Sequence, residues 1–173
     1  MQARDSTLHE ILLPVRGTFI IFTFVLALLV NFLPWSGWWM FLKPDFVALV
    51  LLYWCIQQPR KVGFTSAWLL GLVMDVAEGS LFGQHALAYS VLAYAGIVLH
   101  RRVLMFTLRD QILHVVVLLL LNDLIVLGVR MFAGAAFPGW SYFAGSLVAA
   151  VMWPVLTYIF KLPQRPTPDP DRV

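Results

Sequence analysis

Long apolar runs separated by short polar turns dominate this chain, and they restrict its fold more than any other feature. A helix that crosses a bilayer needs about 20 mostly apolar residues. The chain has 173 residues, of which 61% are hydrophobic and 12% are charged, whereas a soluble domain carries about 25% charged residues. Six membrane spans would use most of the chain and leave no room for a separate soluble domain. We therefore predict an all-α membrane protein, a bundle of about six transmembrane helices.

The apolar runs and the polar segments between them predict three parts. Residues 1–16 form a cytoplasmic N-terminal segment, residues 17–160 a six-span transmembrane domain, and residues 161–173 a proline-rich cytoplasmic tail that we expect to be disordered. The expected spans cover residues 17–33, 45–56, 62–77, 86–99, 112–132 and 142–160. A semi-apolar stretch at 103–108, between two basic clusters, is expected to lie in the membrane interface as a short amphipathic helix.

The second span is the weakest of the six, because it is short and is interrupted upstream. Residues 45–56 make only about 18 Å of helix. In one interpretation the helix begins at the membrane interface, with Pro44 in its first position and Asp45 at the positive end of the helix dipole. In the other, a broken helix enters from Trp38.

The basic residues predict the orientation of the bundle. With both termini in the cytoplasm, ten of the twelve Lys and Arg residues lie on the cytoplasmic side, and only Lys43 and Arg130 lie on the other. Cytoplasmic loops carry an excess of Lys and Arg, so this pattern favours six spans over five or seven. The turns at Arg60-Lys61 and Arg101-Arg102 are best interpreted as topology signals, with contact to anionic lipid or a cytoplasmic partner as the alternative. Such short clusters do not form a nucleic-acid surface.

The chain lacks the residue combinations that catalysis at membrane depth requires. Cys55 is the single cysteine, which excludes an intramolecular disulfide and a multi-cysteine metal site. His85, His100 and His114 do not have the spacing of metal ligands on one helix. No Gly-x-Ser-x-Gly pattern surrounds Ser80. We expect no catalytic residues, no cofactor and no metal site.

Acidic residues within or beside spans are costly and often mark function. Asp45 is expected to start a helix at the outer interface, with a polar contact to a partner as the functional alternative. Asp75 shares a face of small residues with Ala67 and Gly71, spaced to let two helices pack closely. Asp75 is either an acid at the outer end of its span, solvated or bonded to a neighbouring helix, or a membrane-embedded junction that fixes helix packing or meets a partner helix.

Two further groups of residues are of interest. Gly79 and Gly83 lie in the link before His85, where turn formation explains them, and His85 is expected at the outer start of the fourth span. Asp123 is the most deeply placed acid. Arg130 is seven residues further along the same face, too far for a certain ion pair. A structural junction at Asp123 is favoured over a proton or substrate relay.

Several segments carry a resemblance to a known family. The specific part runs from Pro44 to Leu87, and the whole resemblance covers about residues 16–162. The matching segments are Pro44-Asp45, Tyr53-Trp54, Gln58-Pro59-Arg60-Lys61-Val62-Gly63, Ala67-Trp68-Leu69-Leu70-Gly71-Leu72-Val73-Met74-Asp75, Gly79-Ser80-Leu81-Phe82-Gly83-Gln84-His85-Ala86-Leu87, Leu121-Asn122 and Trp153-Pro154. Together they resemble the bacterial rod shape-determining family MreD in its proteobacterial form. Asp123 departs from that pattern, in which an uncharged polar residue is usual.

The resemblance implies a fold, a location and partners. It implies a multi-pass protein of the bacterial inner membrane with the six-helix fold of the membrane S-subunit of energy-coupling-factor vitamin importers. It also implies membership of the cell-elongation machinery, binding to the bitopic protein MreC, and work alongside MreB, RodA and a class B penicillin-binding transpeptidase. No reaction of its own is implied. We expect the candidate residues, which are Asp45, Gly71, Asp75, Gly79, Gly83 and His85, to shape the bundle or meet a partner helix.

Two other functions remain open from the sequence. The importer fold makes a small-molecule importer subunit plausible, although the spans offer few polar residues of the kind that line a pocket. An intramembrane hydrolase is disfavoured, because no nucleophile and base pair is evident.

Overall fold

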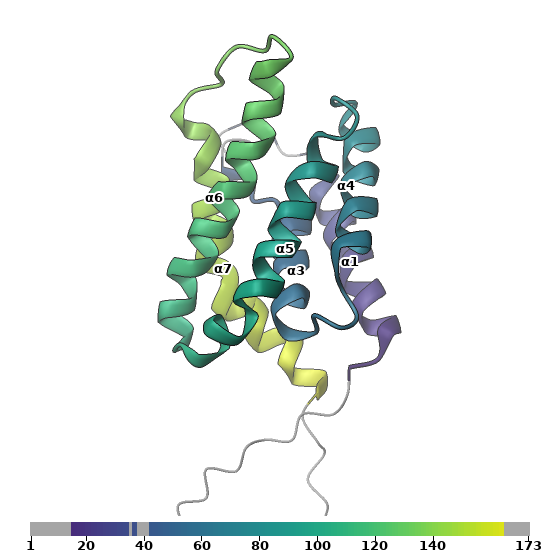
Figure 1. The fold of residues 1–173 in the computed structure, drawn as a ribbon, viewed down its shortest axis with the longest axis vertical. Coiled ribbons are helices and arrows are strands. Elements are labelled where there is room, and N and C mark those ends of the chain that lie inside the picture. Colours follow the sequence, from purple (N-terminus) through teal and green to yellow (C-terminus); the bar gives the residue numbers. More distant parts are fainter. Residues whose placement is uncertain (1–14, 35, 38–41, 165–173) are drawn as a thin grey trace, which may run out of the picture.

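The computed structural model describes residues 15–34, 36–37 and 42–164, and this part of the chain is helical without strands (Figure 1). Its α-helices are α1 (Gly17–Asn31), α3 (Phe46–Gln57), α4 (Phe64–Glu78), α5 (Gln84–Met105), α6 (Leu108–Phe132) and α7 (Ala144–Lys161). Two 3₁₀ turns flank α7, η1 (Trp140–Phe143) and η2 (Leu162–Gln164). The prediction of an all-α bundle of six helices is confirmed for these residues.

Successive helices run up and down, so the bundle has two distinct ends. At the first end α1, α4 and α6 finish and α3, α5 and α7 begin, and we call this the cavity end. At the second end, called the basic end, the first and last described residues lie close together (Figure 1). There the Lys61 ammonium donates to the Val15 carbonyl.

Helix α3 is the centre of the bundle and contacts α1, α5, α6 and α7. All its residues from Val47 to Ile56 are buried, and most are 0% exposed. A helix that is hydrophobic on every side belongs in the interior of a bundle. The short second run is therefore the core of the fold rather than a marginal span.

Helix α3 starts two residues later than the interpretation with Pro44 in its first position predicted. The helix begins at Phe46, and Asp45 is its N-cap, so Pro44 precedes the helix instead of opening it. A side-chain carboxylate at the N-cap satisfies free backbone N–H groups, which explains the later start. The alternative entry point at Trp38 lies outside the described residues.

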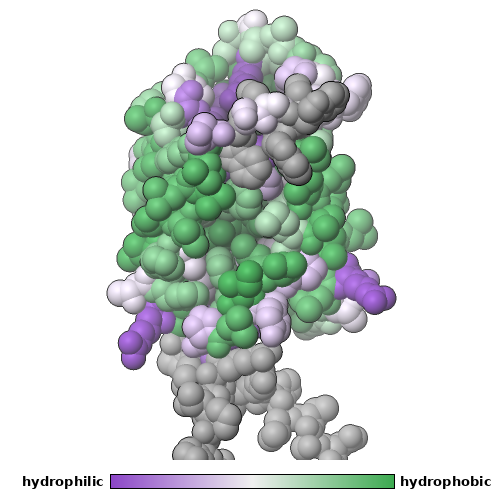
Figure 2. Space-filling model, turned by 180° about the vertical axis from the view of Figure 1, so that it is seen from behind, coloured by the Kyte–Doolittle hydropathy of each residue, from purple (hydrophilic) through white to green (hydrophobic). Residues whose placement is uncertain are grey.

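The helices of the bundle differ in length and in whether they could cross a membrane. Three stretches, at Gln84–Met105, Leu108–Phe132 and Trp140–Gln164, are long and apolar enough to cross a membrane, whereas α1 and α3 are shorter apolar helices. Figure 2 shows a broad band of hydrophobic side chains across the middle of one face, with hydrophilic ones near both ends. Such a belt suits contact with lipid, and spanning by the shorter helices stays a prediction.

The expected interfacial helix at residues 103–108 is wrong. Helix α5 continues through His100 to Met105, and α6 begins at Leu108 after a two-residue link. Val103 is 0% exposed within the core, so continuing the helix buries an apolar side chain that an interfacial helix would leave out. Of the tail expected to be disordered (161–173), Lys161 is the last residue of α7 and Leu162–Gln164 form η2, so the prediction is wrong for these residues. Residues 165–173 lie outside the described part of the chain.

Aromatic side chains fill the core near the basic end. The Trp54 ring stacks on Phe160 with centroids 5.7 Å apart, and Tyr53 meets Trp54 edge-on at 5.0 Å. Both buried indoles find acceptors, since Trp54 Nε1 donates to Thr23 Oγ1 at 2.9 Å and Trp153 Nε1 donates to Gln111 Oε1 at 3.1 Å. The core at this end thus combines dense ring packing with hydrogen-bonded indole groups.

Candidate functional site

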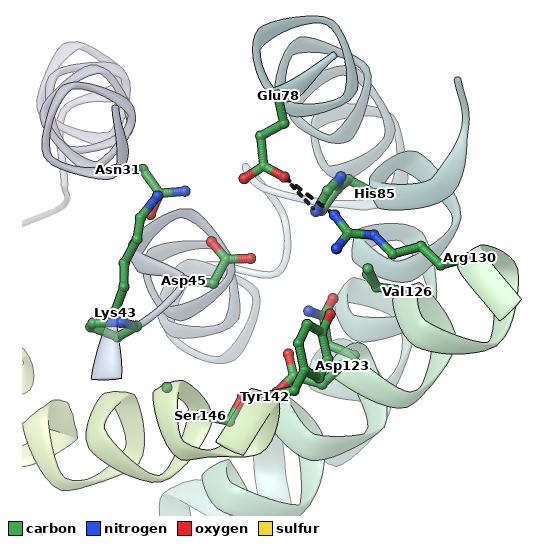
Figure 3. A pocket seen from close by; sticks show the side chains of 13 residues that line it. Asn31, Lys43, Asp45, Glu78, His85, Asp123, Val126, Arg130, Tyr142 and Ser146 are labelled. Atoms are coloured by element: carbon green, nitrogen blue, oxygen red, sulfur yellow. Dashed lines mark hydrogen bonds and ion pairs between the residues drawn. The ribbon is translucent and has the colours of Figure 1, made fainter. Parts of the chain in front are cut away.

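A polar cavity of about 310 Å³ opens among the helices at the cavity end (Figure 3). We call it the polar cavity. Its lining residues are Asn31, Lys43, Pro44, Asp45, Glu78, His85, Asn122, Asp123, Val126, Arg130, Tyr142, Gly145 and Ser146. They come from five helices (α1, α4, α5, α6 and α7), the segment before α3 and the turn η1. The expectation that the spans offer few pocket-type polar residues is therefore wrong. These residues are scattered in the sequence and come together only in the fold, so the sequence alone did not reveal the pocket.

Glycine 145 brings one wall of the cavity close to α7. A Cβ atom at Gly145 would lie 2.4 Å from the carbonyl oxygen of Lys43, so the segment before α3 rests directly on α7. Real Cβ atoms do not approach other atoms this closely. The absence of a side chain at Gly145 thus sets the position of Lys43 and Asp45 at the cavity wall.

Asp45 joins two helices at the wall of the cavity. Its Oδ1 atom accepts hydrogen bonds from the backbone N–H groups of Val47 at 3.1 Å and Ala48 at 3.0 Å. Its Oδ2 atom accepts from the Tyr89 hydroxyl on α5 at 2.7 Å. The expected cap at the helix start is present, and the bond to Tyr89 fixes α3 against α5.

Asp75 is 1% exposed and does not line the cavity. Its carboxylate accepts from the backbone N–H groups of Gly83 and His85, both at 2.8 Å, and from His85 Nδ1 at 2.9 Å. Ser80 Oγ adds a fourth bond at 3.2 Å. A negative charge at the N-terminus of α5 is electrostatically favourable. Asp75 is thus bonded to the neighbouring helix rather than solvated, and it holds the link between α4 and α5.

The small-residue face of α4 packs inside the chain. A Cβ atom at Gly71 would lie 2.3 Å from Ala86 Cα, so the backbones of α4 and α5 touch at this point. Ala67 and Asp75, on the same face, are also buried. Since α5 occupies this face, a partner helix would have to displace α5 to reach it.

The link between α4 and α5 depends on backbone conformations that glycine favours. Gly79 has φ of 59° and Gly83 has φ of 97°. Gly79 ends α4 and Gly83 precedes α5, so the two residues turn the chain back onto the carboxylate of Asp75. The structure agrees with turn formation as the reason for both glycines.

A second polar group connects α4 and α5 to α6 at the rim of the cavity (Figure 3). Glu78 Oε2 lies 3.7 Å from Arg130 Nη2 and 3.7 Å from His85 Nε2. Arg130 Nε donates to Gln84 Oε1 at 3.3 Å. Arg130 therefore pairs with Glu78 across helices, and neither Glu78 nor Gln84 was a candidate from the sequence.

Asp123 lies on the opposite side of the cavity from Asn31 and Lys43 (Figure 3). Its Oδ2 atom accepts a hydrogen bond from Ser146 Oγ, which joins α6 to α7. Ser146 and Tyr142 had no signal in the sequence, since a lone hydroxyl residue in an apolar run is ordinary. Asn31, Lys43 and Glu78 lie beside chain turns, where polar residues are also ordinary.

The described residues also include groups that could be considered for metal binding or reactivity away from this wall. Within this part of the chain, no group of three or more His, Cys, Asp or Glu residues is placed to hold a metal ion. Cys55 is 0% exposed inside α3 and does not line the polar cavity. Two other hollows are an apolar groove of about 390 Å³ beside α4 and α5 and an open one of about 540 Å³ beyond Arg130.

Comparison with known proteins identifies the relatives of the chain. The family described as "rod shape-determining protein MreD" matches residues 15–163. The rod shape-determining protein MreD of Haemophilus influenzae is 33% identical over 131 residues, which cover 76% of this chain and 81% of that protein. No solved structure matches the chain, so the likeness to vitamin-importer S-subunits stays a prediction. By the extent of both matches, the chain belongs to the MreD family of rod shape-determining proteins.

Proposed function

We propose that the chain is a non-enzymatic membrane component of the bacterial cell-elongation complex, which maintains rod shape by organising side-wall peptidoglycan synthesis through binding MreC. Family membership assigns the chain a role in cell shape. The resemblance described above supports the finer statement, with MreB, RodA and a class B penicillin-binding transpeptidase as further members of the complex. All six helices form one bundle, so the bundle surface itself is the working surface.

The proposed location is the inner membrane, with both termini in the cytoplasm. Among the described residues, seven Lys and Arg lie at the basic end, whereas Lys43 and Arg130 lie at the cavity end. The seven are Arg16, Arg60, Lys61, Arg101, Arg102, Arg109 and Lys161. The positive-inside rule then places the basic end in the cytoplasm and the cavity end on the periplasmic side.

The proposed contact surface for MreC is the cavity end. The observation that carries this choice is the polar cavity itself, where residues from five helices and the segment before α3 meet and most of the side chains are charged or polar. Asp45 and His85 line the cavity. Gly71 and Asp75 lie outside the cavity and hold α4 against the start of α5, which carries His85. The sides of the bundle carry mainly apolar side chains, which suit lipid.

The importer alternative is favoured by the same cavity, since a polar pocket in a small helical membrane protein is a ligand-binding feature. The two functions predict different phenotypes when the chain is depleted from the cell. Depletion of the chain in its native bacterium should round the cells if it acts in elongation. Unchanged shape with a new nutrient requirement would instead support the importer.

The proposed contact is tested by filling the cavity without changing its charge. Val126→Phe adds a ring at a buried lining position of α6, and we expect loss of most co-purified MreC and of rod-shape complementation. Leu124→Phe is the matched control, because Leu124 lies on the same helix and is exposed outside the cavity. A folded Val126→Phe protein that retains MreC and restores rods would refute the assignment of MreC to this end.

A further inference from the structure

The charges that line the polar cavity do not balance. Its acids are Asp45, Glu78 and Asp123, and its permanent bases are Lys43 and Arg130. Glu78 and Arg130 pair with each other at 3.7 Å. Asp45, Asp123 and Lys43 have no ion-pair partner among the described residues. Apart from His85, which bonds to Asp75, the wall therefore holds one more carboxyl group than permanent base.

The cavity also has unused hydrogen-bond acceptors. The Oδ1 atoms of Asn31 and Asn122 have no donor in the described part of the chain. Both residues line the cavity and are buried, at 3% and 2% exposure. Buried polar atoms nearly always have a partner. Four lack one among the described residues: the hydroxyls of Tyr53 and Thr157 lie away from the cavity, and these two amide oxygens belong to residues that line it.

The positions of these groups suit one occupant between them. Figure 3 shows Asn31 and Lys43 on one side of the cavity and Asp123 with Tyr142 on the other, while Asp45 lies between. The two carboxylates already accept bonds from neutral donors only, namely hydroxyl and backbone N–H groups. A volume of about 310 Å³ is at the lower end of small-molecule pockets.

We propose that the polar cavity is a binding site for a single ammonium or guanidinium group. Such a group supplies the missing positive charge and several N–H donors for Asp45, Asp123 and the unpaired amide oxygens. An anion would face a net negative wall and leave those oxygens unpaired. The site goes beyond the proposed function, because a free small amine or a Lys or Arg side chain of a bound polypeptide could occupy it.

The chemistry is tested on the purified protein in lipid nanodiscs without any partner. N-acetyl-argininamide and agmatine are titrated by calorimetry, with N-acetyl-citrullinamide as the neutral analogue of nearly equal shape. We expect saturable binding of the two cations, and binding of the citrulline compound weaker by about tenfold or more, since a charge-assisted bond is lost. Equal binding of all three probes, or no binding by protein that keeps its helical content, would overturn the proposal.

Two variants then place the bound cation. Asp123→Asn removes a charge at nearly constant shape and should weaken argininamide binding by about tenfold. Asp110→Asn, at the basic end of the same helix, should leave it unchanged, because Asp110 is exposed and outside the cavity. Equal affinity of both variants would overturn the assignment to this cavity. If Asp123→Asn does not fold, the argininamide and citrullinamide comparison on the native chain still decides the chemistry.

The source of the cation is resolved by repeating the titration on the complex with MreC. Competition between argininamide and MreC means that a side chain of the partner fills the site. Undiminished argininamide binding to the complex means that the site serves a free amine. Both outcomes support the site, and neither depends on the Val126→Phe result, so failure of the MreC assignment is distinguishable from failure of the cation site.

Discussion

Charged side chains are exposed to solvent at one end of the bundle and turned inward at the other. At the basic end, Arg60, Lys61, Arg101, Arg102 and Arg109 are exposed and surround a tightly packed aromatic core. At the cavity end, charged groups turn inward, where they cap helices and join neighbouring elements. The basic end can orient the protein without specific geometry, because positive-inside topology depends on charge count. The hydrogen bonds and ion pairs at the cavity end, in contrast, require each group to lie in a specific position.

This difference predicts that similar substitutions have unequal effects at the two ends. Removing one partner from a buried, hydrogen-bonded charge leaves the other groups desolvated and unpaired, at a cost of about 3–5 kcal/mol. Exposed charges contribute about 0–1 kcal/mol. Substitutions at matched positions should therefore differ most where the carboxylate or the close backbone contact is buried.

Asp75→Ala should destabilise the protein most. The substitution leaves the N–H groups of the half-buried Gly83 and the buried His85 without an acceptor and frees the link before α5, for an expected loss of about 3–5 kcal/mol. Asp110→Ala is the control, because Asp110 is an exposed acid in the first turn of α6 and should cost about 1 kcal/mol or less. Denaturant unfolding in detergent, followed by circular dichroism, measures both. Equal losses would mean that burial of the carboxylate does not matter.

Gly71→Ala should come next. The added Cβ would collide with the backbone of Ala86, and backbone cannot move aside as a side chain does. Forcing α4 and α5 apart should cost about 1–3 kcal/mol. Gly128→Ala on α6 is the matched control, since nothing lies within 4 Å of its Cβ. Alanine favours a helix over glycine by about 1 kcal/mol, so this control should be neutral or stabilising. If both variants unfold at the same denaturant concentration, α4 and α5 do not pack as closely as described.

Local patterns in the sequence predicted the helices, whereas contacts between distant residues could not be predicted. Six helices and their alternation follow from apolar runs and charge, because both are local patterns. The small-residue spacing of Ala67, Gly71 and Asp75 predicted close helix packing, but not that α5 would be the partner. Burial of Asp75 could not be decided, because its donors come from a link whose path depends on two glycines.

The polar cavity could not be predicted for a related reason. Asn31, Asn122 and Ser146 lie far apart in sequence and have no shared spacing. Each one alone is an ordinary polar residue in or beside an apolar run. Only the packing of α1, α6 and α7 around α3 brings their ends together. Local sequence patterns predict helices, whereas a site built from many helix ends requires the three-dimensional arrangement.

Arg130→Gln should have the smallest effect of the three. The Arg130 side chain is 37% exposed, so water screens its pairing with Glu78, and the expected loss of stability is about 1 kcal/mol or less. Arg101→Gln, an exposed charge at the basic end, should produce no measurable change. Glu78→Gln tests the pairing itself, because the double variant should then lose no more than either single variant. Additive losses in this cycle would show that Arg130 acts through the bond to Gln84 instead, and that the cavity rim depends on α5 rather than on the end of α4.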